Sequence, residues 1–169
     1  MLVLIGLGGN LGNVASAFAV VRDALAARGE VRGASGIWRT AAIGPEQSDF
    51  LNAALLLDLP GHPLSLLASC RGLEAAAGRN RSREGRWGPR PLDLDLLVAE
   101  GCVVASPALT LPHPRLAGRR FALAPAAELV PGWVHPRLHR TLAELAVDPA
   151  VAAQRCDRIG PFPPPSPRS

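Results

Sequence analysis

The sequence predicts an α+β fold in which helices pack on an antiparallel sheet. Short apolar runs of strand length alternate with longer segments whose apolar residues recur at helical spacing. Clusters of glycine and proline separate these segments and mark the turns. Their order along the chain is β-α-β-β-α-β, the ferredoxin-like order. We therefore expect a core with a four-stranded antiparallel sheet, helices on one face of it, and a C-terminal extension.

The first half of the chain begins with a buried strand. Residues 2–7 form an apolar run that ends at the glycine-rich turn 8–12. Over 14–28 the apolar residues recur on one stripe and Gly29 follows, which is typical of an amphipathic helix and its end. A second strand is expected over 31–40.

The second half repeats this alternation. The expected elements are a strand over 50–59, a helix over 64–77, a strand over 92–99, and helices near 122–129 and 141–146. The sequence contains no internal repeat and no linker, so we predict a single domain over 1–158. Residues 159–169 are rich in proline and serine, and we expect this tail to be disordered or extended.

The composition excludes two kinds of chemistry. All 18 basic residues among the 169 are arginine. A P-loop and a Schiff-base mechanism each need a lysine, so both are excluded. The net charge of +4 favours anionic partners without choosing between a nucleotide, a nucleic acid and a membrane surface.

The cysteines and the first residues bear on the compartment. Cys70, Cys102 and Cys156 are widely spaced and form no C-x-x-C pair, which supports neither a structural zinc site nor a disulfide framework. The apolar start over 1–7 has no basic region before it and runs into glycines, which indicates a strand and not a signal peptide. No apolar run reaches membrane-spanning length, so we expect a cytoplasmic protein.

The stretch 79–95 carries the strongest functional signal. Its guanidinium groups are planar donors suited to phosphate oxygens. Asp93 and Asp95 follow in a strand, where residues two apart share a face. Two such carboxylates repel each other unless a cation lies between them, and Mg²⁺ usually binds one or two carboxylates together with substrate phosphates. The stretch therefore predicts a magnesium and nucleoside-triphosphate site. Its arginines are Arg79, Arg81, Arg83, Arg86 and Arg90.

Other interpretations stay open on these residues alone. A run of arginines is also typical of a solvated face or a nucleic-acid patch, and a ferredoxin-like sheet can bind RNA by stacking bases on aromatic side chains. Against that, the strands carry no cluster of aromatics of the kind RNA-binding sheets use, and Asp93 and Asp95 repel a phosphate backbone. A magnesium-dependent nucleotidyltransferase of another specificity would share the metal site and differ only in its acceptor pocket.

The longer string over 86–97, Arg-Trp-Gly-Pro-Arg-Pro-Leu-Asp-Leu-Asp-Leu-Leu, resembles the signature of a folate-pathway family. That family is 6-hydroxymethyl-7,8-dihydropterin pyrophosphokinase, and the resemblance extends from Leu2 to about Leu145. It implies an ATP-dependent diphosphokinase in which the pterin hydroxymethyl oxygen attacks the β-phosphorus of ATP and AMP leaves. It also implies ATP as co-substrate, two Mg²⁺ ions, and small-molecule substrates in place of a nucleic acid or a membrane. We further expect a monomer.

The resemblance also assigns roles to individual residues. It implies that Asp93 and Asp95 are the metal ligands and that Arg79, Arg90 and Asp95 are catalytic. The implied ATP contacts are Arg81, Trp87, Arg90, Leu96, Thr110, His113 and Arg119. The implied pterin contacts are Thr40, Ile43, Phe50, Asn52 and Phe121. Phe50 stands where the family often has tyrosine, which removes one hydroxyl beside the pterin.

Overall fold

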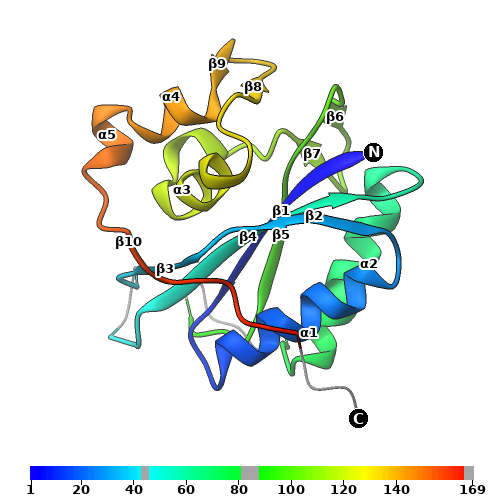
Figure 1. Cartoon of the computed structure of the whole chain (residues 1–169), viewed down its shortest axis with the longest axis vertical. Coiled ribbons are helices and arrows are strands. Elements are labelled where there is room, and N and C mark those ends of the chain that lie inside the picture. The colour runs from blue at the N-terminus through cyan, green and yellow to red at the C-terminus, as the bar shows by residue number, and fades with distance from the viewer. Residues whose placement is uncertain (43–45, 81–87, 166–169) are drawn as a thin grey trace.

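The computed structural model describes residues 1–42, 46–80 and 88–165 (Figure 1). The helices are α1 (Val14–Ala26), α2 (Pro63–Ala76), α3 (Arg120–Leu129), α4 (Leu142–Ala146) and α5 (Pro149–Ala152), with a 3-10 turn η1 (Leu116–Gly118). The long strands are β1 (Leu2–Gly9), β4 (Phe50–Asp58) and β5 (Asp93–Ala99). Shorter strands are β2 (Glu30–Ala34), β3 (Ile37–Thr40), β6 (Val104–Ala105), β7 (Thr110–Leu111), β8 (Val134–His135), β9 (Arg140–Thr141) and β10 (Asp157–Gly160).

The main sheet is antiparallel and has β1 near its centre. Its strand order is β10-β3-β4-β1-β5, with β2 also pairing with β4. The mixed α and β architecture is therefore confirmed, but the expected count of four strands is wrong, because this sheet has six. Pairs of short strands, β6 with β7 and β8 with β9, form two further small sheets.

The expected strand over 31–40 is broken, which is one reason for the higher count. The side chain of Ser35 takes part in the strand pairing, because Ser35 Oγ accepts the backbone N–H of Ala54 at 2.8 Å. The next residue, Gly36, donates its N–H to Glu128 Oε1 at 3.0 Å and so leaves the ladder. The break separates β2 from β3, and both still pair with β4.

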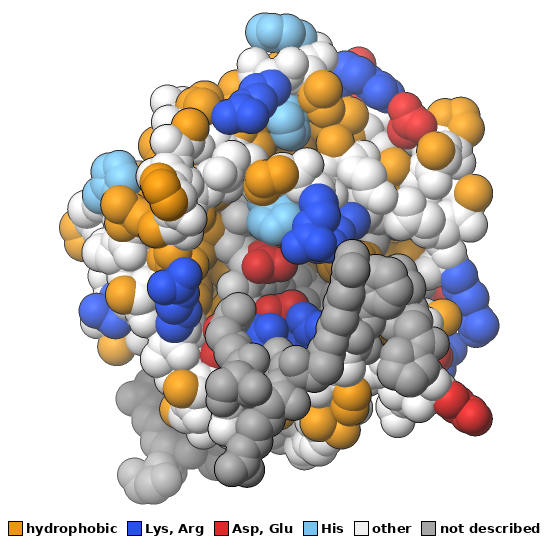
Figure 2. Space-filling model, turned by 180° about the vertical axis from the view of Figure 1, so that it is seen from behind, with side chains coloured by type: hydrophobic (Ala, Val, Ile, Leu, Met, Phe, Trp, Pro, Cys, Tyr) orange, Lys and Arg blue, Asp and Glu red, His pale blue; other side chains and the backbone are white. Residues whose placement is uncertain are grey.

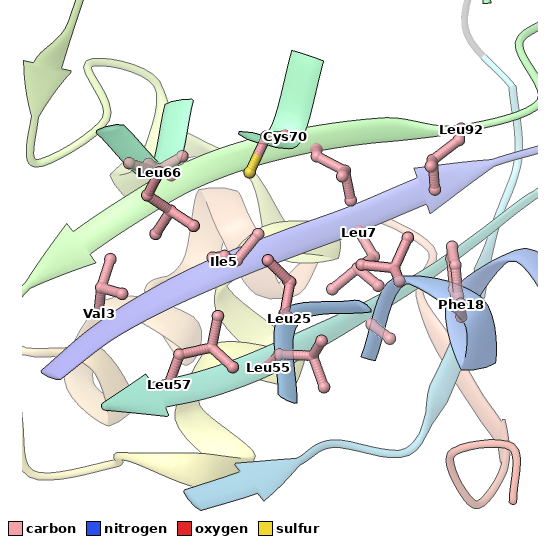
Figure 3. Packing of buried hydrophobic residues seen from close by; sticks show 14 of the residues in the cluster. Val3, Ile5, Leu7, Phe18, Leu25, Leu55, Leu57, Leu66, Cys70 and Leu92 are labelled. Atoms are coloured by element: carbon pink, nitrogen blue, oxygen red, sulfur yellow. The ribbon is translucent and has the colours of Figure 1, made fainter. Parts of the chain in front are cut away.

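Helices cover both faces of the sheet, so the expectation of helices on one face alone is wrong (Figure 1). On the first face, alternate residues of β1 and β4 pack against α1 and α2 (Figure 3). Residues of the opposite parity, such as Leu4 and Ala54, pack against α3 and α4 on the other face. The side chains labelled in Figure 3 on the first face are Val3, Ile5, Leu7, Phe18, Leu25, Leu55, Leu57, Leu66, Cys70 and Leu92.

The C-terminal segment runs along the edge of the sheet, and its last described residues lie beside α1 (Figure 1). It forms β10, which pairs with β3, so the expected division between residues 158 and 159 falls inside a strand. Farther on, the rings of Phe162 and Phe18 stack with centroids 6.3 Å apart. The end of the expected tail, 166–169, lies outside the described residues. Within the described ranges, no helix combines the length and the apolar character that crossing a membrane requires.

Candidate active site

A pocket with a volume of about 700 Å³ opens on the face of the sheet that α3 covers. Figure 2 shows acidic, basic and histidine side chains gathered around a hollow on one face of the molecule. Two glycines of β1 form part of its floor: Gly6 pairs with Asp95 of β5, and Gly8 pairs with Asp93. A Cβ on Gly8 would lie 3.3 Å from Asn52 Oδ1, so the absence of side chains here keeps the floor open.

Asp93 is held by two arginines. Arg79 Nη1 donates to Asp93 Oδ1, and Arg90 Nη1 donates to Asp93 Oδ2 at 2.9 Å. Burial alone would raise the pKa of Asp93, but the charges and hydrogen bonds of Arg79 and Arg90 outweigh it and hold that pKa below its usual range. Asp93 is therefore a stable carboxylate whose two oxygens both have partners.

Asp95 has the opposite environment. Burial raises the pKa of this carboxyl and the charge of Asp93 raises it further, while His113, Arg119 and Arg115 pull it down in part. Among the described residues, no side chain forms an ion pair with Asp95 or donates a hydrogen bond to it. A buried carboxylate beside a second one is stabilised by a cation placed between them.

These two carboxylates fit a magnesium site that a nucleotide completes. Within 1–42, 46–80 and 88–165, no group of three or more His, Cys, Asp or Glu residues could hold a metal on its own. Mg²⁺ does not require such a group, because it binds through one or two carboxylates, water and substrate phosphates. Asp93 and Asp95 offer hard oxygen ligands on one face of β5, so the donor set suits this ion.

The wall of the pocket beyond Asp95 is built by residues 113–119 and is positively charged. His113 donates its backbone N–H to Leu97 O at 2.7 Å, which docks this loop on β5. His113 Nδ1 accepts the N–H of Arg115 at 3.1 Å, so the neutral ring carries its proton on Nε2. Burial lowers the pKa of His113, and the nearby charges of Arg119 and Arg115 lower it further against the carboxylates. The neutral ring with an Nε2 donor is therefore favoured.

Aromatic and amide side chains form a further part of the lining, which we call the aromatic end. Phe50 and Phe121 both line it, and each has a guanidinium over its ring: Arg90 lies 5.9 Å from the Phe50 centroid, and Arg119 lies 5.4 Å from the Phe121 centroid. Asn52 is buried, and its Nδ2 donates to Thr40 Oγ1 at 3.0 Å. This bond fixes which end of the amide is which and aligns the Asn52 side chain with the floor.

Residues 4–131 match the family model described as 7,8-dihydro-6-hydroxymethylpterin-pyrophosphokinase (HPPK). This chain belongs to the HPPK family. It is 39% identical over 144 residues to a 2-amino-4-hydroxy-6-hydroxymethyldihydropteridine pyrophosphokinase of Synechocystis, a match that covers 84% of this chain and 73% of that protein. It is 42% identical over 133 residues to a protein of the same name from Methylorubrum extorquens, covering 77% of this chain and 83% of that one.

Solved structures agree with this fold. An HPPK-DHPS crystal structure from Plasmodium falciparum superposes with a TM-score of 0.63 over 86% of this chain, at 12% sequence identity. The match covers 42% of that chain, so the present protein spans less than half of its length. At this identity the likeness concerns the fold alone.

Most of the residues that the resemblance singled out meet in this pocket of the HPPK domain. They are Arg79, Arg90, Asp93, Asp95, Phe50, Asn52, His113, Arg119 and Phe121, and Thr40 stands behind Asn52. Two are not among the lining residues: the side chain of Leu96 is in the apolar cluster under α1 and α2, and Thr110 is on β7. It is Leu97, the next residue, that lines the pocket. Ile43, Arg81 and Trp87 lie outside the described residues.

Two residues that hold this site together received no role in the sequence analysis. Glu74, near the end of α2, is 1% exposed, and it accepts a hydrogen bond from Arg79 and one from the N–H of Leu94 at 2.9 Å. Asn10 accepts the N–H of Arg90 at 2.9 Å and donates to Ser48 O at 3.0 Å. Glu74 is the one carboxylate in the otherwise apolar run 73–77, which is a weak sequence signal for a buried role. Asn10 lies in a glycine-rich turn, where an asparagine is common and gives no such signal.

Proposed function

We propose that this chain transfers the pyrophosphoryl group of ATP to the hydroxymethyl oxygen of 6-hydroxymethyl-7,8-dihydropterin. The products are AMP and the pterin diphosphate, and the reaction is a step of folate biosynthesis. Membership of the HPPK family supports the reaction. One observation about the pocket supports it for this chain in particular. A single cavity is lined by paired carboxylates, by cationic side chains, and by two phenylalanines with a buried amide. That combination suits a polyphosphate chain facing a flat heteroaromatic acceptor.

The cationic wall is the proposed binding surface for the ATP phosphates. Arg119 presents a planar donor group, and the neutral His113 donates from Nε2. Arg90 and Arg79 add two further cations, each anchored by its ion pair with Asp93. Groups held in this way need little reorganisation when negative charge develops on the transferring phosphates, and such preorganised donors lower the barrier.

Asp93 and Asp95 would hold the magnesium ions, two of which we propose. When bound, Mg²⁺ neutralises phosphate charge and orients the polyphosphate for in-line displacement. Asp95 is the carboxylate whose oxygens have no ion-pair partner among the described residues. We therefore assign to Asp95 a second task, the orientation of the hydroxymethyl group.

The aromatic end is the proposed pterin slot. Phe50 and Phe121 offer faces for stacking, and the Asn52 amide, with its Nδ2 bound to Thr40, keeps its carbonyl oxygen for the polar edge of the ring. Burial of Asn52 makes this recognition selective, because an acceptor without the matching donor would leave a buried polar group unpaired.

Several finer properties belong to the same proposal. The strand order β3-β4-β1-β5 with α1 and α2 as crossovers supports a ferredoxin-like core. We also propose that the enzyme is a cytoplasmic monomer that binds neither nucleic acid nor membranes. The thiols of Cys70, Cys102 and Cys156 are free, which is consistent with a reducing compartment.

Incubation with ATP, Mg²⁺ and 6-hydroxymethyl-7,8-dihydropterin tests this function, with nucleotide products separated by chromatography. We expect AMP and the pterin diphosphate in equal amounts, and neither product when Mg²⁺ is chelated. Release of ADP would place the attack at the γ-phosphorus, and release of AMP without dihydropterin would reveal hydrolysis. Either result would contradict the proposed transfer.

A further inference from the structure

The functional arginine at the start of α3 occupies the N-cap position. Arg119 has an extended backbone there, with φ −125° and ψ 105°, and its side chain makes no capping hydrogen bond. The first N–H groups of a helix have no partner within the helix, and Ser, Thr, Asp or Asn usually supplies one from the N-cap position. A guanidinium has no acceptor atom, so Arg119 is unable to do this.

Gln154 supplies the missing cap from another part of the chain. Its Oε1 accepts the backbone N–H of Arg120 at 3.0 Å, and its Nε2 donates to the carbonyl of Gly118 at 2.9 Å. These two bonds hold the backbone on either side of Arg119. Gln154 follows α5 and lines the pocket, yet it lies beyond the residues 4–131 that the HPPK family model matches.

The side chain of Arg120 in turn binds the backbone around Gln154. Its Nη1 donates to the carbonyl of Gln154 at 3.1 Å and to the carbonyl of Ala152. The carbonyls at the end of α5 thereby receive a cation, which is the favourable arrangement at a helix C-terminus. Gln154, after α5, therefore binds the backbone before α3, and Arg120, at the start of α3, binds the backbone after α5. We call these reciprocal bonds the clasp.

We propose that Gln154 is a positioning residue for the pyrophosphoryl transfer. Both polar atoms of its amide are engaged with the protein backbone, so it acts through its neighbours and not by contact with a substrate. The neighbours are Arg119 and Phe121, whose guanidinium and ring lie 5.4 Å apart and which face the two substrates. This inference rests on the proposed function for the roles of Arg119 and Phe121.

The clasp should affect the binding of both substrates. A side chain that contacts one ligand mainly changes the affinity for that ligand alone. Gln154 fixes the backbone between an ATP-facing cation and a pterin-facing ring, so its loss displaces both together. We expect Gln154→Ala to weaken the binding of a nonhydrolysable ATP analogue and of the dihydropterin in parallel, each by about 5- to 10-fold, the effect of a lost helix cap.

The experiment compares Gln154→Ala and Gln154→Glu with Arg155→Ala as control. Arg155 is the next residue, and its exposed side chain pairs only with Asp157 among the described residues. Glutamate keeps the acceptor for the Arg120 N–H and loses the donor to Gly118, so it should retain part of the affinity. Hydrogen exchange in the ligand-free protein should be faster over 118–123 in Gln154→Ala and unchanged in Arg155→Ala.

The readouts separate failure of this inference from failure of the proposed function. If the unaltered protein produced no AMP, the proposed function would fall, while ligand-free exchange would still decide whether Gln154 caps α3. Unchanged exchange in Gln154→Ala would overturn the inference. It would also be overturned by faster exchange with both affinities equal to those of Arg155→Ala, because Gln154 would then be structural only. A thermal midpoint measured for each variant ensures that affinities are compared on folded protein.

Discussion

Asp93 and Asp95 are the same residue type on the same face of the same strand, but they differ in their ion pairs and in the direction of their pKa shifts. Asp93 has both oxygens bound by arginines, and its pKa is lowered although burial works against it. Asp95, two residues further along, is buried without an ion-pair partner among the described residues, and its pKa is raised. Strand geometry makes them neighbours, but residues outside the strand make them different.

The difference teaches how one strand can supply both a carboxylate that anchors arginines and a carboxylate without an ion-pair partner among the described residues. Asp93 holds Arg79 and Arg90 in place, and Glu74 backs Arg79 from behind. The charged form of Asp95 is disfavoured by burial and by Asp93, and His113, Arg119 and Arg115 offset this only in part. A bound cation would stabilise the charged form. Pairs of titratable groups with opposite pKa shifts are typical of active sites. Four experiments test this contrast and the site around it, in order of expected effect.

The largest effect is expected for Asp95→Asn. The amide keeps the size of the side chain and removes the charge that we propose binds Mg²⁺, so we expect kcat to fall by about 10²- to 10³-fold. Steady-state production of AMP measures this. Glu100→Gln is the matched control, because it removes an exposed carboxylate that directly follows β5. Turnover within twofold of the unaltered enzyme would remove Asp95 from the metal site.

Arg90→Ala tests the anchored side of the site. If Arg90 meets charge that develops during transfer, its loss should lower kcat by about 10- to 100-fold and the affinity for an ATP analogue much less. Arg90→Lys retains the charge without the bidentate fork and should recover only part of the rate. Single-turnover kinetics and analogue titration separate the two quantities.

Arg71→Ala is the control for charge alone, because it removes an exposed arginine of α2. If Arg90→Ala and Arg71→Ala produced the same modest change, confined to affinity, these arginines would act only by raising the local concentration of the nucleotide.

Much of this site could be predicted because it depends on local periodicity. Alternation in 92–97 places Leu92, Leu94 and Leu96 in one apolar cluster and leaves both aspartates on the other face, and the structure has them so. The helix expected over 14–28 corresponds to α1 (Val14–Ala26), since its apolar stripe is set by helical spacing.

The rest could not be predicted because it depends on contacts between distant residues. Asn10 and Arg90 meet across 80 positions, and Gln154 and Arg120 meet across 34. The break at Ser35 follows from a hydroxyl that replaces one backbone partner, which leaves no trace in the apolar pattern. In the same way β10 lies at the start of a proline-rich tail, so composition conceals a strand that only its partner β3 stabilises.

Phe121→Ala tests the aromatic end, with an intermediate expected effect. Loss of a stacking ring should weaken dihydropterin binding by about 1–3 kcal/mol, whereas the affinity for the ATP analogue should change little. Calorimetric or fluorescence titration of each ligand measures the two effects. Phe162→Ala is the aromatic control, since that ring stacks on Phe18 beside α1. Equal losses for both ligands would show that Phe121 does not serve the pterin selectively.

The smallest effect concerns stability, and it tests the contrast between the two carboxylates without any substrate. In metal-free protein near pH 7, Asp93→Asn should lower the melting temperature, because it leaves Arg79 and Arg90 without their shared partner. Asp95→Asn should raise it, because it removes a buried charge that Asp93 repels. Each shift should be about 2–4 °C, the effect of 1 kcal/mol in a chain of this size.

The pH dependence of these shifts follows from the directions of the two pKa values. The folded-state pKa of Asp93 is lowered, so its stabilising ion pairs persist above the usual value of 3.8 and are lost only as the pH falls through the lowered value. The folded-state pKa of Asp95 is raised, so the unaltered protein takes up a proton there before it unfolds. The advantage of Asp95→Asn should therefore shrink first as the pH falls, while the deficit of Asp93→Asn remains. Calorimetry in EDTA from pH 7 to pH 4 measures both. Equal destabilisation by the two substitutions would mean that the two carboxylates have the same electrostatic environment. The arginines, His113 and burial would then not shift the two pKa values in opposite directions.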